Sequence, residues 1–192
     1  MTEVRNADYG TFGESGGAYT LRWERTYSRP IATVWAALTE PERLNDWLGA
    51  CEVEPRVGGR FDVFVNRDAD TQVTGRVLRW EPPRVLEFTW KGHEEETETI
   101  VRAELSEAEG GGTRMVFTHR GMERKWLGLT LPGWHSLLMR LDSLMREGRS
   151  IPDSSDRWRD LQRRYLERYG IGDTMTEPPQ PMEKYKMDES RD

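Results

Sequence analysis

The sequence predicts an α+β fold, in which a curved antiparallel β-sheet packs against one long helix near the C-terminus. The helix is indicated by residues 131–147, where apolar positions recur at helical spacing and form one wide buried stripe. The stripe consists of Trp134, Leu137, Leu138, Leu141, Leu144 and Met145. Before it, about six segments alternate apolar and polar residues as strands do. A long helix laid across such a sheet encloses apolar space, and small molecules bind in such space.

The ends of the long helix carry signals of their own. Pro132 suits a first helical turn, and Gly148 follows the last residue, where a left-handed conformation is common. A second amphipathic helix is predicted over residues 153–169. Its apolar side carries Trp158, Leu161, Tyr165 and Tyr169. We expect this helix to fold back onto the domain, because Pro152 and a short connection turn the chain sharply.

The first half of the chain predicts a hairpin, two short helices and a series of strands. Residues 9–12 and 18–28 are expected to pair around Gly16 and Gly17, since a Gly-Gly turn supplies positive φ. Pro30 and Pro41 each begin a short helix. From Cys51 onward the pattern has a period of two. Strands are predicted over residues 61–65, 72–80, 85–90, 101–105 and 115–119.

Composition argues against several classes of protein. The 192 residues carry a formal net charge of −6 and no block of Lys and Arg, which argues against a nucleic-acid partner. No apolar run approaches the ~20 residues that cross a bilayer, and the polar first residues do not resemble a signal peptide. The single Cys51 excludes an internal disulfide and fits a reducing compartment. We therefore expect a cytoplasmic protein without membrane insertion.

The same patterns divide the chain into four parts. Residues 1–17 form a flexible N-terminus that can supply a hairpin strand, and residues 18–149 form the main domain. Residues 150–170 hold the additional amphipathic helix. Residues 171–192 have little apolar content and several prolines, which is typical of a disordered tail.

Five segments, taken in order, carry a family resemblance. They are VWAALTEPERLNDWLGA (34–50), VGGRF (57–61), EPPRVLEFTW (81–90), GGTRMVFTHRG (111–121) and GWHSLLMRL (133–141). Together they resemble the START-like superfamily (SRPBCC), which includes Bet v 1, and within it the branch named for activators of the Hsp90 ATPase (AHSA1-like). The resemblance covers residues 19–148 and implies a helix-grip fold with a hydrophobic cavity between sheet and long helix. The superfamily includes lipid carriers, polyketide cyclases and aromatases, co-chaperones, and resistance proteins that bind enediyne antibiotics and are cleaved in their place.

The inward-facing positions of the strands and of the long helix are the expected lining of this cavity. They are Trp47, Phe61, Val63, Val65, Phe88, Trp90, Met115, Phe117, His119, Trp134, Leu138 and Leu141. Aromatic walls stack on flat or polyene ligands, which favours a ligand site. The alternative is that these side chains are ordinary core.

Three polar side chains require separate interpretation. His119 falls on an inward strand position, where it either binds or protonates a ligand group or forms a structural hydrogen bond. Arg25 lies among apolar neighbours and needs a partner, either Glu87 or a ligand acid. His135 follows Trp134 on the helix and is expected to face outward.

No familiar catalytic or metal-binding motif is present. The sequence lacks G-x-S-x-G, H-E-x-x-H, a Walker loop and a Rossmann fingerprint. Residues 94–96, an acidic run after His93, lack the convergent spacing of metal ligands, and Cys51 has no adjacent base. We therefore assign no catalytic residue, metal or cofactor.

The leading hypothesis is binding or sequestration of a hydrophobic small molecule, which includes a polyketide-type natural product and self-resistance. In the self-resistance form, a reactive ligand would cleave the chain at Gly75, Gly121 or Gly133, although a bulge or turn also explains each glycine. An enzymatic alternative is a cyclase, aromatase or hydrolase in which His119 and Arg25 position a reactive chain. A third alternative is interaction with an Hsp90-type chaperone. We expect a monomer.

Overall fold

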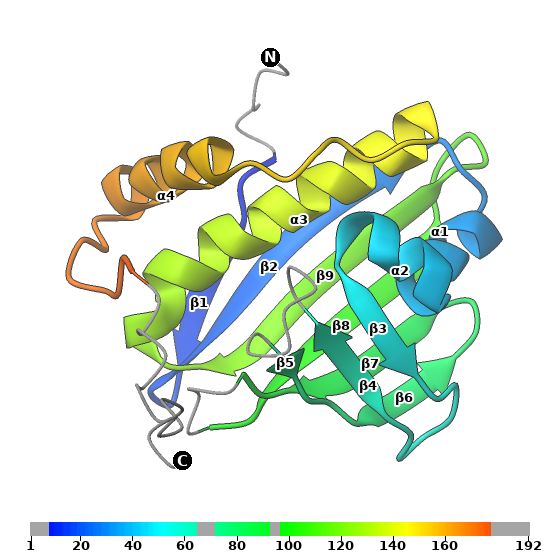
Figure 1. The fold of residues 1–192 in the computed structure, drawn as a ribbon, viewed down its shortest axis with the longest axis horizontal. Coiled ribbons are helices and arrows are strands. Elements are labelled where there is room, and N and C mark those ends of the chain that lie inside the picture. The colour runs from blue at the N-terminus through cyan, green and yellow to red at the C-terminus, as the bar shows by residue number, and fades with distance from the viewer. Residues whose placement is uncertain (1–7, 65–71, 93–96, 178–192) are drawn as a thin grey trace, which may run out of the picture.

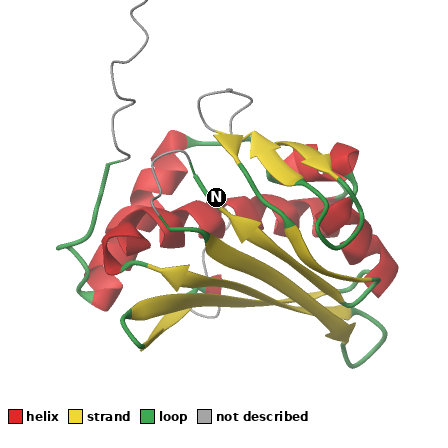
Figure 2. Ribbon diagram, turned by 90° about the horizontal axis from the view of Figure 1, so that it is seen from below, coloured by secondary structure: helices red, strands yellow, loops and turns green. Residues whose placement is uncertain are grey.

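The computed structural model describes residues 8–64, 72–92 and 97–177. A six-stranded antiparallel sheet has the strand order β1-β2-β9-β8-β7-β6, and a three-stranded sheet, β3-β4-β5, adjoins it through isolated bridges. The large sheet curves beneath the long helix α3, as Figures 1 and 2 show. This arrangement is the predicted helix-grip α+β fold.

The elements follow the predicted order along the chain, except that the strand predicted over residues 72–80 is divided into β5 and β6, which belong to different sheets. The strands are β1 (Thr11–Ser15), β2 (Ala18–Tyr27), β3 (Ala50–Val53), β4 (Phe61–Phe64), β5 (Gln72–Val73), β6 (Val77–Glu81), β7 (Val85–Trp90), β8 (Thr99–Glu107) and β9 (Thr113–Met122). The helices are α1 (Ile31–Thr39), α2 (Pro41–Trp47), the 3₁₀-helix η4 (Arg124–Trp126), α3 (Leu127–Glu147) and α4 (Ser155–Tyr169).

The N-terminal hairpin forms around the predicted Gly16–Gly17 turn, with its first strand at Thr11–Ser15 and not at residues 9–12. β1 pairs with β2 from Ser15–Ala18 to Thr11–Arg22, and Gly16 and Gly17 both have positive φ in the turn. Because β1 reaches only to Arg22, the second half of β2 pairs with β9 alone. This half of β2 is therefore an open edge of the sheet.

Alternate residues of β2 face α3. Leu21, Trp23, Arg25 and Tyr27 are buried, and the residues between them are more exposed. The same alternation on β8 and β9 directs Val101, Ala103, Leu105, Met115 and Phe117 into the core. The single buried charge among the inward positions of β2, Arg25, is therefore directed at the helix.

α3 begins earlier than the sequence predicted. It starts at Leu127, so Pro132 is the sixth residue of the helix and not part of its first turn. The 3₁₀-helix η4 leads directly into it, which extends the helix N-terminally beyond the apolar stripe. The C-terminal signal is confirmed: Gly148 ends the helix with φ 75°.

α4 lies against the outer side of α3 (Figure 1), which corrects the expectation for His135. His135 is fully buried, because α4 covers the helix face that the sequence assigned to solvent. Its Nδ1 lies 3.0 Å from the hydroxyl of Tyr165, which is also buried. Ser154 caps the start of α4 by accepting a hydrogen bond from the backbone N–H of Arg157.

The chain continues in a defined path after α4. Residues 171–177 were expected to be disordered, but Ile171 is buried and the N–H of Met175 donates to the carbonyl of Lys125 at 2.8 Å. Contact with α3 and η4 orders this segment, a tertiary effect that local composition does not reveal. Residues 178–192, the rest of the expected tail, lie outside the described residues.

Candidate functional site

The predicted cavity residues form an aromatic cluster between the sheet and the first half of α3. We use this name for Phe61, Phe88, Trp90, Phe117, His119 and Trp134. Neighbouring rings are in contact along the cluster: Phe61 stacks on Phe88 at 3.9 Å, and Trp134 lies 4.9 Å from Trp90 and 4.6 Å from Phe117, measured between ring centroids. Trp90 is partly exposed and the other five rings are buried. The cluster therefore joins the core to the surface at Trp90.

The polar atoms of the cluster form one chain of hydrogen bonds. The indole N–H of Trp134 donates to Nδ1 of His119 at 2.9 Å, so Nδ1 carries no proton. The neutral ring then has its proton on Nε2, which donates to Oγ1 of Thr99 at 2.7 Å. The Thr99 hydroxyl in turn donates to the carbonyl of Trp90 at 2.9 Å. Both nitrogens of His119 are occupied by structural bonds.

This arrangement removes His119 from acid–base chemistry near neutral pH. The side chain is 1% exposed, and burial lowers its pKa to about 3. A general base needs a pKa near the working pH and a free nitrogen directed at the substrate. Neither condition is met at His119.

The remaining predicted lining residues are also packed in the core. Trp47 donates its indole N–H to the carbonyl of Ala37 at 2.9 Å. The others with buried side chains are Val63, Met115, Leu138 and Leu141. Val65, His93 and residues 94–96 lie outside the described residues. None of the predicted cavity-lining residues lines either of the two surface pockets described below.

Each of the three candidate cleavage glycines can be placed in the backbone. At Gly75 a Cβ would collide with the carbonyl oxygens of Thr89 and Phe61, which is the close approach that the sequence indicated. Gly121, with φ 84°, is the extra residue of a β-bulge in β9. Gly133 lies inside α3, where a Cβ would meet only Trp158 at 4.0 Å. Gly75 and Gly121 are therefore explained by the fold.

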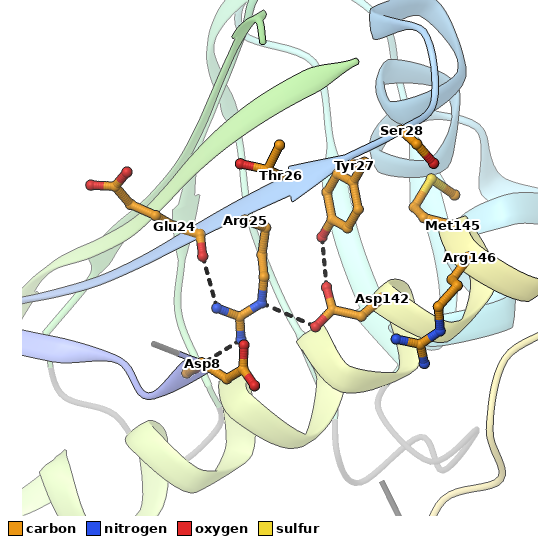
Figure 3. A pocket seen from close by; sticks show the side chains of 9 residues that line it. All are labelled: Asp8, Glu24, Arg25, Thr26, Tyr27, Ser28, Asp142, Met145 and Arg146. Carbon is orange, nitrogen blue, oxygen red and sulfur yellow. Dashed lines mark hydrogen bonds and ion pairs between the residues drawn. The ribbon is translucent and has the colours of Figure 1, made fainter. Parts of the chain in front are cut away.

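The larger pocket opens between the free edge of β2 and the second half of α3, and it has a volume of about 590 Å³ (Figure 3). Its lining is polar and charged. The lining residues are Asp8, Glu24, Arg25, Thr26, Tyr27, Ser28, Asp142, Met145 and Arg146. Sequence analysis found Arg25 here but missed Asp142, although an inward arginine on β2 already required a carboxylate on the facing helix.

Arg25 is held by structural partners at the floor of this pocket. Its Nε donates to Oδ2 of Asp142 at 3.0 Å, and its two terminal nitrogens donate to the carbonyls of Glu24 and Asp8, each at 2.9 Å. The partner is thus Asp142 and not the expected Glu87. Glu87 pairs instead with Arg102 and Arg120, because it faces the opposite side of the sheet from Arg25.

Tyr27 completes the group at Asp142. Its hydroxyl donates to Oδ1 of Asp142 at 2.9 Å, so both carboxylate oxygens have partners. Burial raises the pKa of Asp142 above its ordinary value, although Arg25 and Tyr27 oppose that rise. Burial, together with the Asp142 charge, raises the pKa of Tyr27 well above its ordinary value. These bonds make the group a structural connection between β2 and α3.

The described residues include no candidate for a metal-binding site or for a membrane-spanning helix. Its His, Cys, Asp and Glu side chains form no group of three or more with the geometry to hold a metal ion. Burial raises the pKa of the Cys51 thiol to about 12, which disfavours the reactive thiolate. None of the described helices combines the length and hydropathy needed to span a bilayer.

The fold, with its packed core under α3, defines a helix-grip domain. Comparison with known proteins identifies the family. The model of the family described as activator of Hsp90 ATPase homolog 1-like protein matches residues 28–146. The chain belongs to this family. No curated protein sequence matches the chain.

Solved structures of bacterial proteins share the fold. CalU16 from Micromonospora echinospora is 25% identical, with a TM-score of 0.67 over 82% of this chain and 95% of its own. EF2215 from Enterococcus faecalis, a conserved protein of unknown function, is 24% identical, with a TM-score of 0.72 over 90% of this chain and 95% of its own. DynU16, from the dynemicin biosynthetic locus, is 21% identical, with a TM-score of 0.61 over 68% of this chain and 48% of its own.

Proposed function

We propose that the protein binds and sequesters a hydrophobic aromatic small molecule, of which a polyketide-type natural product is one example, against the aromatic cluster beneath α3. The observation that carries this proposal is the unbroken series of ring contacts from the buried Phe61–Phe88 stack to the partly exposed Trp90. Flat apolar ligands gain dispersion and hydrophobic energy on such a surface. The family fold, which encloses space between sheet and helix, supports the same location.

The electrostatics of the cluster favour an uncharged aromatic ligand over a charged one. The cluster presents ring faces and neutral hydrogen bonds, because the polar side-chain atoms of Trp134, His119 and Thr99 are hydrogen-bonded to one another. Because the buried rings are in mutual contact, we expect a ligand to insert at Trp90 and to move the Trp90 and Trp134 indoles apart. Binding would then change tryptophan emission directly.

A fluorescence titration tests this proposal. Aromatic polyketides, sterols and fatty acids are added while emission and the melting temperature are recorded. We expect an aromatic member of the panel to bind, and Trp90→Leu to weaken that binding about ten-fold. Trp80→Leu is the matched control, because Trp80 packs on Trp35 at the far edge strand β6. An unchanged signal across the panel, or equal weakening by both substitutions, would refute the proposal.

The enzymatic alternative gains no support from the described geometry. His119 is neutral with both nitrogens occupied, and Arg25 is bound to Asp142 and two carbonyls. Product analysis after incubation with any ligand that binds separates the two functions: stoichiometric binding without product supports sequestration, and turnover favours a cyclase, aromatase or hydrolase. Co-chaperone activity rests on the family description alone, and the ATPase rate of an Hsp90-type chaperone with and without the protein tests it.

The self-resistance form of the proposal makes a separate claim about chemistry. Incubation with an activated enediyne, followed by mass measurement of the fragments, would reveal cleavage at Gly75, Gly121 or Gly133. Gly133 is the informative position, because its lack of a side chain has no steric explanation: a Cβ there would meet only Trp158 of α4, at 4.0 Å. Random scission or an intact mass would refute this form and leave simple sequestration standing.

A further inference from the structure

Three arginines, one on α3, one just after it and one on α4, differ from most of the other described arginines. In the described chain most arginines form ion pairs, for example Arg102 with Glu87 and Arg114 with Glu24. Arg140, Arg149 and Arg157 form none with any described carboxylate. A guanidinium group without an ion pair can form charge-assisted hydrogen bonds with an added anion.

Arg140 and Arg149 line the second pocket, and Arg157 lies close to Arg140. The pocket lies between α2, the second half of α3 and the connection to α4, and its volume is about 420 Å³. Its lining residues are Asn45, Asp46, Arg140, Leu144, Gly148, Arg149, Ser150, Ile151 and Pro152. Figure 1 shows the connection running back along α3 from its end toward α4, and its residues 148–152 are part of the pocket lining. The pocket is distinct from the aromatic cluster.

The inner arginines have buried donors without acceptors. One terminal nitrogen of Arg140 donates to the carbonyl of Asp46 at 3.1 Å, while its Nε is buried and unpartnered. Arg157 donates to the carbonyl of Pro152 at 2.7 Å, and its Nε is likewise buried and unpartnered. Buried polar hydrogens without partners are rare in native proteins and call for an explanation by an additional group.

The groups around Arg140 carry charges of both signs. Burial is the main cause that lowers the pKa of Arg140, and the neighbouring Arg157 lowers it by less than Asp153 raises it. Asp153 and Asp46 act in the opposite direction, but both side chains are exposed and neither is ion-paired with these arginines. With Arg149 at the rim, the guanidinium groups outnumber the carboxylates.

We propose that this pocket binds a small organic anion, whose carboxylate or phosphate group is held by Arg140 and Arg149 with Arg157 behind them. An oxyanion supplies the acceptors that the buried guanidinium N–H groups lack, and charge-assisted bonds of this kind are strong. The Asn45 amide offers a further donor. A pocket of this volume is larger than a single oxyanion, and Leu144, Ile151 and Pro152 provide an apolar surface for the carbon part of the ligand.

Calorimetric titration of the full chain with benzoate and with phenyl phosphate tests the inference, and benzamide serves as the uncharged analogue. We expect one of the anions to bind with a Kd of about 1 mM or lower, in a manner weakened by salt, and benzamide not to bind. The two anions distinguish a carboxylate ligand from a phosphate ligand.

Substitutions locate the binding. Arg149→Gln changes an exposed side chain that makes no described side-chain bond, so the fold is retained, and we expect the Kd to rise about ten-fold. Arg140→Gln should have the same effect. Arg159→Gln is the control, since Arg159 is exposed and faces Asp156 on α4. Absence of saturable binding, equal binding of benzamide, or an equal loss in Arg159→Gln would overturn the inference.

Discussion

The side-chain amide of Gln162 donates a hydrogen bond of 3.0 Å to the carbonyl of Gly128, four residues before Pro132. In a regular helix this carbonyl would accept from the N–H of residue 132, which proline lacks. Gln162 belongs to α4, and the same amide also donates to the carbonyl of Thr176 at 2.8 Å. A side chain of α4 therefore donates the hydrogen bond that Pro132 cannot donate to Gly128. The same side chain also connects the segment after α4, through Thr176, to the start of α3.

We predict that Gln162→Ala lowers the free energy of unfolding by about 1–3 kcal/mol, because it leaves a buried carbonyl without a donor. In a Pro132→Ala background the restored N–H serves Gly128, so the same substitution should cost about 1 kcal/mol less. Urea unfolding of the four proteins in this cycle gives the coupling. Arg163→Ala, one residue away and exposed, should change stability by under about 0.5 kcal/mol. A purely additive cycle would contradict the compensation.

A second prediction concerns α4 as a whole. Truncation after Gly148 removes Leu161 and Tyr165, which are buried, and uncovers His135. The melting temperature should fall while the truncated protein stays monomeric by light scattering. Tyr165→Phe is the milder test: it leaves the N–H of Gly10, 2.8 Å from the hydroxyl, without its acceptor and should cost about 1–2 kcal/mol. If truncation leaves stability unchanged, or converts a dimer to a monomer, α4 serves an interface instead.

The order of elements could be predicted from the sequence because its signals are local. The period-two strands, the apolar stripe of residues 131–147 and the Gly148 stop each depend on neighbouring residues only. The predicted start of α3 was wrong because η4 runs directly into the helix ahead of the apolar stripe. The prediction that His135 faces outward was wrong because α4, the helix that covers this residue, comes later in the chain.

The site could be predicted only in part for the same reason. The inward direction of Arg25 follows from the alternation on β2. That Arg25 forms its ion pair with Asp142 and not with Glu87 depends on which face of the sheet each residue occupies. The pocket around Arg140 could not be predicted, since it combines α2, α3 and the connection to α4. Whether the aromatic side chains line a cavity or fill the core depends on their packing, which periodicity does not encode.

Two buried histidines predict a loss of stability in mild acid. The pKa values of His119 and His135 are lowered to about 3 by burial, whereas in the unfolded chain they are about 6.5. Below pH 6.5 both histidines bind protons in the unfolded state but remain neutral in the folded state. The free energy of unfolding therefore decreases as the pH falls toward 3. The slope approaches about 1.4 kcal/mol per pH unit for each histidine.

Urea unfolding at pH 7, 6 and 5 measures this slope in a range above the titration of most carboxylates. We expect a loss of roughly 2 kcal/mol between pH 6 and 5, and His119→Gln or His135→Gln should each remove about half of it. A slope that neither substitution changes would show that other groups titrate there.

The last prediction concerns the bond between Arg25 and Asp142, the central contact in Figure 3. The Arg25 side chain is almost completely buried, so Asp142→Leu removes its ion-pair partner and should destabilise the protein by about 3 kcal/mol. Arg25→Met leaves Asp142 with Tyr27 as its remaining side-chain partner, and because Asp142 is 24% exposed, water can compensate part of the loss. The combined variant has no stranded charge, and it should be more stable than the sum of the single changes by about 1–3 kcal/mol. The exposed pair Arg114–Glu24 is the matched control, where the same cycle should give under about 1 kcal/mol of coupling. Chemical denaturation of the variants in both cycles measures the two coupling energies. Equal coupling at the two pairs would show that burial does not strengthen the ion pair between β2 and α3.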